Sequence, residues 1–136
     1  MMDVVAAFIP AGDRFLICRR PFGKKRGGLW ELAGGKPEEG ESAAEALARE
    51  CREELDVDIS VGETLGCVTY GYDDVTIRLT VLRASIVGGE LKPLEHSDLR
   101  WIRAEDIGRY DFCPADELIL DAIRALAAEN GGRLDA

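Results

Sequence analysis

The 136-residue chain lacks an uninterrupted apolar run of 18 residues, the length that a membrane-spanning helix requires. No signal-peptide pattern precedes the first expected strand, and no cysteine pair has the spacing of a metal or redox motif. The cysteines are scattered, mostly in apolar surroundings, at Cys18, Cys51, Cys67 and Cys113. We therefore expect a soluble, cytoplasmic protein whose cysteines are reduced and structural.

Positive charge is also scarce. The chain has 17 Lys and Arg against 26 Asp and Glu, a formal net charge of −9. No basic face is available to neutralise a phosphate backbone, which argues against a nucleic-acid polymer as the partner. The one basic cluster is Arg19, Arg20, Lys24, Lys25 and Arg26. A short cationic loop suits a small polyphosphate better than a duplex.

Internal repeats and linkers are absent as well, so residues 1–136 are expected to form a single α+β domain. Apolar runs and turn residues predict strands and helices along the whole chain, with a frayed tail over residues 130–136. The strands are expected at 4–9, 15–18, 29–32, 64–70, 75–82 (with a continuation at 85–87) and 99–102. The helices are expected from Ser42 to Leu55, as a single turn at 104–107, and at 115–128.

The first long helix carries an unusual set of carboxylates. Ser42 and Glu45 form a capping box, which predicts that the helix begins there. Glu50, Glu53 and Glu54 then fall along one edge of its apolar stripe, in the last two turns. Like charges at these spacings repel one another, and the helix dipole disfavours anions there. Clustered carboxylate oxygens are what Mg²⁺ or Mn²⁺ requires, although a solvated acidic face gives the same pattern.

The residues before this cluster favour the metal site. Gly35 is followed after five residues by Glu41, after seven more by Arg49-Glu50, and then by Glu53-Glu54. This arrangement over residues 35–57 resembles the Nudix box, with every charged position and both spacers matched. Two positions depart from the pattern. Cys51 replaces an aliphatic residue, and Asp56 replaces a glycine that follows the helix in a left-handed conformation, which Asp also tolerates.

The resemblance implies a Nudix fold, a mixed β-sheet sandwiched between helices, and metal-dependent hydrolysis of a nucleoside diphosphate derivative. It implies that Glu50, Glu53, Glu54 and the Gly34 carbonyl bind Mg²⁺ or Mn²⁺. It also implies that Arg49 holds a catalytic glutamate by a charge-assisted hydrogen bond. For Glu41 two roles stay open, a metal ligand or a structural partner.

The resemblance also implies a carboxylate outside the box, a base or metal ligand that precedes a strand near a Trp. Glu95, just before the strand with Trp101, fits this description, and Asp98 is the weaker alternative. His96 is the only histidine. Histidine is a common general base, but a lone loop histidine is more often solvated.

Residues 29–36 and 112–116 resemble MutT-type nucleoside triphosphate pyrophosphohydrolases. This resemblance implies that Arg20 contacts phosphate and that Asp116 faces the base, or else serves as a charge at the helix start. The predicted substrate-binding residues are Arg20, Lys25, Glu31, Gly34, Lys36 and Asp116. An ionised Asp116 only accepts hydrogen bonds, which favours an exocyclic amine or ring N–H on the base.

The predicted reaction is hydrolysis of a (deoxy)nucleoside triphosphate, ordinary or oxidised, to the monophosphate and pyrophosphate. ADP-ribose, a nucleotide sugar and a dinucleoside polyphosphate remain alternative substrates. A non-catalytic nucleotide-sensing module is the alternative of another class. The expected partner is a small nucleotide, with no nucleic-acid polymer and no membrane, and the expected state is a monomer or a homodimer.

Overall fold

The computed structural model describes residues 1–135. A mixed sheet has the strand order β5-β1-β7-β6, in which β1 and β7 are parallel and the other neighbours antiparallel. A second, antiparallel sheet has the order β2-β3-β4, and β8 pairs with β3. The strands are β1 (Met2–Phe8), β2 (Pro10–Ala11), β3 (Arg14–Arg19), β4 (Trp30–Glu31), β5 (Gly34–Gly35), β6 (Val57–Gly71), β7 (Thr76–Gly89) and β8 (Asp98–Arg103). The helices are α1 (Ala43–Leu55), the 3₁₀ helix η1 (Ala104–Arg109) and α2 (Pro114–Glu129).

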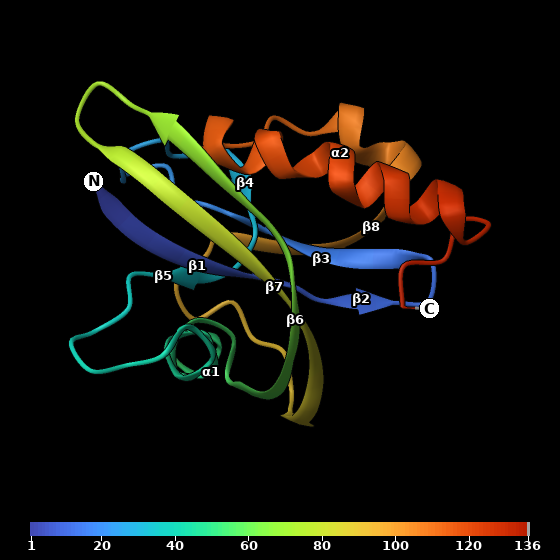
Figure 1. The fold of residues 1–136 in the computed structure, drawn as a ribbon, viewed down its shortest axis with the longest axis horizontal. Helices are drawn as coiled ribbons and strands as arrows, with labels where there is room; N and C mark the ends of the chain where they lie inside the picture. The colour runs from blue at the N-terminus through green and yellow to red at the C-terminus, as the bar shows by residue number, and fades with distance from the viewer. Residues whose placement is uncertain (136) are drawn as a thin grey trace.

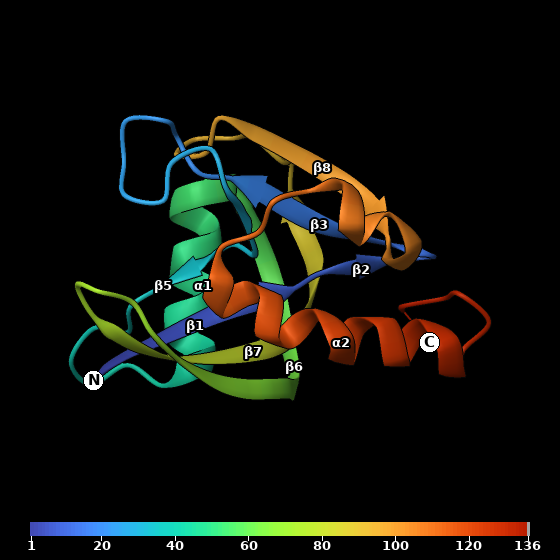
Figure 2. The ribbon, with the colours of Figure 1, turned by 90° about the horizontal axis from the view of Figure 1, so that it is seen from above.

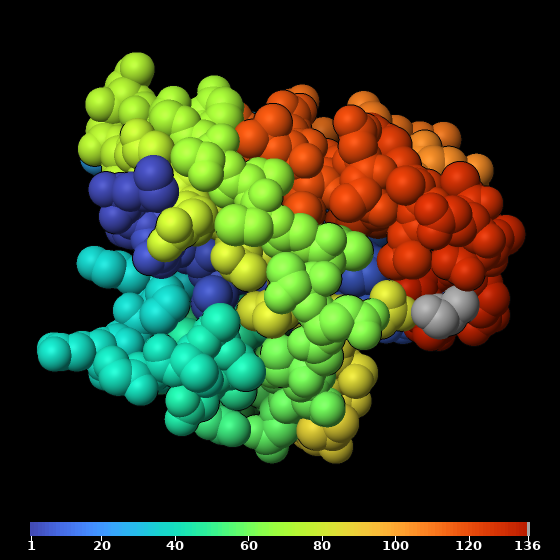
Figure 3. Space-filling model, viewed as in Figure 1, coloured from blue at the N-terminus to red at the C-terminus, as the bar shows by residue number. Residues whose placement is uncertain are grey.

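The two long helices lie on opposite sides of the mixed sheet, α1 below it and α2 above it in the view of Figure 1. Seen from above, they run in clearly different directions (Figure 2). In the space-filling view β6 crosses the front of the molecule between them (Figure 3). This arrangement confirms the predicted α+β fold with a mixed sheet between helices. Within residues 1–135, no helix is long and apolar enough to cross a membrane.

Strands buried on both faces create two cores. In β1, Ala6 and Phe8 pack into the core under α2, whereas Val5 and Ala7 pack into the core under α1. β3 divides in the same way, with Phe15 and Ile17 on one side and Leu16 and Cys18 on the other. This follows from the two-residue period of a strand. Each helix then covers one core and completes a three-layer domain.

The ends of α1 match their predicted signals. Both hydrogen bonds of the Ser42–Glu45 capping box are present. At the other end Asp56 adopts the left-handed conformation, with φ 58° and ψ 36°. Cys51, the other departure from the box, is fully buried in the core under α1. Both departures are therefore accommodated by the structure.

We predict that Asp56→Gly raises the free energy of unfolding by roughly 0.5–1 kcal/mol, because glycine adopts this conformation without a steric penalty. The ion pair that is lost, between Asp56 and Lys92 at 3.5 Å, is half exposed and worth little. Chemical denaturation at one pH gives the difference, with Asp56→Ala as the control expected to lose stability. An unchanged or lower stability for Asp56→Gly would contradict the prediction.

Two elements differ from the sequence prediction. β6 begins at Val57, directly after the helix cap, and not at residue 64, because bulges allow it to stay paired with β7 throughout. The tail is also more ordered than expected. The Leu134 side chain is fully buried, and its N–H donates to the Gly12 carbonyl at 2.8 Å. A single apolar residue in a polar tail thus holds the chain end against the β2–β3 turn.

Candidate active site

The glutamates of α1 point to different environments. Glu54 is 3% exposed, and among residues 1–135 its Oε2 atom has no hydrogen-bond partner. The side chain of Glu50 is largely buried, whereas that of Glu53 is half exposed. A buried carboxylate oxygen without a partner is costly unless a cation binds it.

A small acidic cavity of about 110 Å³ lies beside these side chains. We call it the acidic cavity; the residues lining it include Glu31, Gly34, Glu50, Glu54, Glu95 and His96. Burial, together with the hydrogen bond and charge of Glu50 and the charges of Glu31 and Glu95, raises the pKa of Glu54 to about 10. Four carboxylates around so small a space need positive charge. The donor set therefore fits Mg²⁺ or Mn²⁺, which prefer oxygen ligands.

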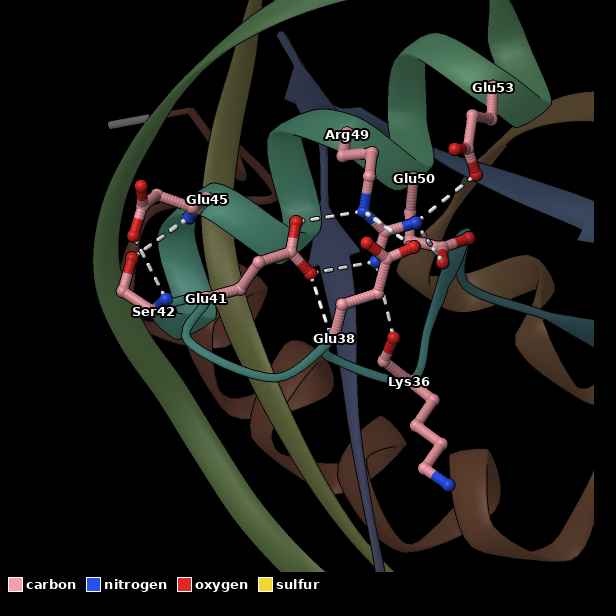
Figure 4. Close-up of polar contacts among 8 residues, drawn as sticks. All are labelled: Lys36, Glu38, Glu41, Ser42, Glu45, Arg49, Glu50 and Glu53. Carbon is pink, nitrogen blue, oxygen red and sulfur yellow. Dashed lines mark hydrogen bonds and ion pairs between the residues drawn. The ribbon is translucent and has the colours of Figure 1, made fainter.

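Arg49 lies at the centre of a network of hydrogen bonds that includes Glu50 (Figure 4). It donates from Nη1 to Glu50 Oε1 at 2.8 Å, the type of contact that the resemblance implies, and to Glu53 Oε2 at 3.2 Å. Its Nε and Nη2 atoms donate hydrogen bonds to the two oxygens of Glu41, at 2.8 and 2.9 Å. Another Nη2 contact reaches the Lys36 carbonyl at 3.2 Å. Arg49 is thus a hub that fixes the helix relative to the loop before it.

Glu41 belongs to this hub and lies outside the acidic cavity. Its hydrogen bonds from Arg49, and then that from the Glu38 backbone, lower the pKa of Glu41 to about 2. The carboxylate is therefore ionised and fully engaged. Of the two roles left open by the sequence, the geometry favours the structural one.

The Glu50 side chain comes so close to the backbone at position 35 that only glycine fits there. A Cβ atom at position 35 would lie 2.5–2.7 Å from the Glu50 carboxylate. At Gly34 a Cβ would collide with the backbone of Val5 and Ala6 in β1. These two glycines therefore let the sheet edge and the helix meet at the carboxylates.

His96 is not solvated, contrary to the sequence prediction. Its side chain is 4% exposed, and Nε2 lies 2.9 Å from Glu31 Oε2 and 3.7 Å from Glu54 Oε1. Glu31 also accepts from Arg20 Nη1 at 3.2 Å. Glu95 lines the acidic cavity as expected, whereas Asp98 pairs with Arg100 at 3.1 Å. The geometry therefore favours Glu95 over Asp98.

A second cavity of about 260 Å³ adjoins the first. We call it the apolar cavity because Val4, Leu32, Ile77, Leu79 and Ala115 form much of its lining. Arg20, Glu31 and Gly34 line both cavities. They form the boundary between an acidic space and an apolar one.

The polar groups of the apolar cavity include Asp116 and Lys36. Asp116 is 7% exposed, and its Oδ2 accepts from the Leu32 N–H at 3.0 Å. Burial first, and then the charge of Glu31, raises the pKa of Asp116 to about 8. Near neutral pH the unliganded protein therefore favours the neutral acid, which donates as well as accepts hydrogen bonds.

Glu31, Cys113 and Asp116 place possible ligand atoms within 4.8 Å of one another. Burial raises the pKa of the Cys113 thiol to about 12, so the thiolate form is absent near neutral pH. A protonated thiol and a protonated acid are poor ligands for a hard cation. The acidic cavity fits Mg²⁺ better than this group does.

Two predicted residues lie elsewhere. Lys25 is 72% exposed and pairs with Asp74 at 3.1 Å. Glu53 is bound to Arg49 and does not line the acidic cavity. Three residues that were not predicted line the cavities instead. Lys24 lines the acidic cavity, and Arg26 and Tyr72 line the apolar cavity. Lys24 and Arg26 belong to the basic cluster, but the sequence does not say which member faces inward.

Known proteins resemble this chain over most of its length. The family model described as "NUDIX domain" matches residues 1–123. A "CTP pyrophosphohydrolase" of Escherichia coli K12 is 38% identical over 128 residues, which cover 94% of this chain and 95% of the relative. A "Putative 8-oxo-dGTP diphosphatase 2" of Mycobacterium tuberculosis is 36% identical, covering 97% of this chain and 93% of the relative.

Solved structures give the same result. The solution structure of the E. coli ORF135 protein matches with a TM-score of 0.82 and 37% identity, over 96% of this chain and 93% of that chain. The MutT protein from Methanosarcina mazei Go1 matches with a TM-score of 0.80 and 28% identity, over 95% and 94%. The chain belongs to the Nudix family. It is a Nudix pyrophosphohydrolase, a hydrolase acting on phosphoanhydride bonds.

Proposed function

We propose that the protein hydrolyses a nucleoside triphosphate to the monophosphate and pyrophosphate, with a divalent metal as cofactor. The observation that carries the proposal is the pair of joined cavities. The acidic cavity suits metal ions and phosphates, and the apolar cavity suits a nucleoside. Similarity to relatives named for CTP and 8-oxo-dGTP supports the same substrate class.

Each group then has a defined task. Glu50, Glu54, Glu95 and the Gly34 carbonyl would hold the metal, which neutralises phosphate charge and activates water when bound. Glu53 would also take part in metal binding, since Arg49 donates hydrogen bonds to both Glu50 and Glu53. Arg20 and Lys24, which line the acidic cavity, would bind the phosphates, while Lys36 lines the apolar cavity and Glu31 lines both cavities. Glu95 acts as a metal ligand or accepts the proton of the attacking water.

Turnover of a panel of nucleotides tests the proposed function directly. With Mg²⁺ we expect one equivalent each of nucleoside monophosphate and pyrophosphate, and no turnover after chelation with EDTA. CTP, dATP, dGTP and 8-oxo-dGTP are compared with ADP-ribose, a nucleotide sugar and a dinucleoside polyphosphate. Release of orthophosphate, turnover without metal, or faster turnover of the second group would refute the proposal. Binding of nucleotides without turnover of any would indicate a sensing module.

A further inference from the structure

Arg26 occupies an unusual position in the loop between β3 and β4. Its backbone φ is 56°, a left-handed conformation that is uncommon outside glycine. Its side chain is 23% exposed and lines the apolar cavity. A largely buried arginine beside a nucleoside-sized space requires an explanation, because its guanidinium carries five hydrogen-bond donors.

The tip of the β6–β7 hairpin holds this guanidinium in place. Its central carbon lies 4.0 Å from the centre of the Tyr72 ring, a cation–π contact. Its Nη1 atom donates to Asp74 Oδ1 at 3.2 Å. The Tyr72 hydroxyl in turn accepts from the Ala115 N–H at 3.0 Å, one residue before Asp116. Tyr72 thus ties the arginine to the start of α2, where Asp116 lies.

A phosphate-binding role fits Arg26 poorly. Arg20 and Lys24 line the acidic cavity, where the phosphates are proposed to bind, whereas Arg26 lines the apolar cavity. There its charge opposes the burial that raises the pKa of the Cys113 thiol. Its positive charge is therefore felt where a base would lie, next to Asp116.

We propose that Arg26 is a specificity-determining residue that donates a hydrogen bond to a carbonyl oxygen of the nucleobase, from a guanidinium stacked on Tyr72. The proposal rests on the proposed nucleotide function. Cytosine, uracil and guanine carry such a carbonyl, and adenine does not. Arg26 therefore favours the binding of cytosine, uracil and guanine, while Asp116 contacts the N–H groups of these bases. Adenine would leave a largely buried donor unpaired, which a site of this kind penalises.

The test compares kcat/KM for CTP, GTP and ATP in the wild type, Arg26→Ala and Arg26→Lys. For Arg26→Ala we expect a loss of about tenfold or more on CTP and GTP, with ATP changed by less than about threefold. Arg26→Lys keeps the charge but loses the planar, stacked fork, so it should not restore the preference. Lys25→Ala is the matched control: Lys25 contacts the same Asp74 but is exposed, so the ratios should stay at the wild-type values.

Binding of CMP, GMP and AMP is measured in parallel by calorimetry, so that the inference is tested even if no triphosphate is hydrolysed. A wild type that binds AMP as tightly as CMP and GMP overturns the role of Arg26. An equal loss on all three triphosphates, restored by Arg26→Lys, assigns Arg26 to phosphate and also overturns it. Base-dependent binding without turnover would instead refute the proposed activity alone. Thermal unfolding of each variant shows whether the loop and hairpin remain in place.

Discussion

Glu54→Gln is expected to lower turnover by a factor on the order of a thousand or more, because it removes a charge that the metal requires. The structure makes Glu54 the most deeply buried glutamate of α1, with one oxygen that lacks a partner among residues 1–135. Saturation with Mg²⁺ or Mn²⁺ should not restore the rate. Steady-state kinetics over a range of metal concentrations measures the effect on kcat and on the apparent metal affinity.

The same substitution is expected to stabilise the metal-free protein. The pKa of Glu54 rises from 4.5 to about 10 in the folded state, chiefly through burial and Glu50. Above pH 4.5 the unfolded chain releases this proton while the folded protein keeps it. The free energy of unfolding therefore falls as the pH rises towards 10. A neutral glutamine has no such cost, so the gain should grow by up to about 1.4 kcal/mol per pH unit, roughly 4 kcal/mol between pH 6 and pH 9.

Glu53→Gln is the matched control for stability. Glu53 is half exposed and hydrogen-bonded to Arg49, so its change should alter metal-free stability by less than about 0.5 kcal/mol at either pH. Its turnover should also fall if it takes part in metal binding. Denaturation curves with EDTA at pH 6 and pH 9 decide the matter. A Glu54→Gln protein that fails to fold would show that this glutamate is structural.

Much of the fold follows from local patterns in the sequence. The capping box at Ser42 predicts the start of α1, and both of its hydrogen bonds are present. Of the predicted apolar stripe, Leu47, Cys51 and Leu55 are buried in the core under α1. Continuous apolar runs at residues 4–9 and 15–18 predict buried strands, and the two cores explain why these runs do not alternate. The motif over residues 35–57 also brings Arg49 close to Glu53, because residues four apart are neighbours on the surface of a helix.

The rest depends on contacts between distant segments. The Leu134 side chain is buried in the core under α2, and its N–H donates to the Gly12 carbonyl in the β2–β3 turn. The sequence predicts a solvated loop residue at His96, because its neighbours Glu31 and Glu54 come from distant segments of the chain. Lys24, Lys25 and Arg26 are consecutive basic residues of one loop, so the sequence cannot assign Arg26 to a cavity and Lys25 to solvent. Loop backbone conformation makes that distinction.

Asp116 should decide which base is preferred. It lines the apolar cavity, and its Oδ2 accepts from the Leu32 N–H. One mispaired buried contact costs roughly 1–3 kcal/mol, about ten- to a hundredfold in relative kcat/KM. Above about pH 8, where Asp116 is ionised and only accepts, Asp116→Asn should therefore shift the preference towards 8-oxoguanine with metal dependence unchanged. Asp116→Ala should lower discrimination more than it lowers the rate on the poorest substrate.

The raised pKa adds a pH dependence that identifies this residue. Below about pH 8 Asp116 is the neutral acid, which both donates and accepts; above that pH it is ionised and only accepts. Ionisation should therefore penalise a carbonyl facing it. Cytosine has an amine where uracil has a carbonyl, so the CTP to UTP ratio of kcat/KM should rise, by up to about tenfold between pH 7 and pH 9. Steps common to both nucleotides cancel in this ratio.

In Asp116→Asn the ratio should be flat over this range, because the amide does not titrate. A ratio that rises equally in wild type and variant would place the titrating group elsewhere, and rank orders that are the same in all three proteins would leave Asp116 as a helix-start residue only.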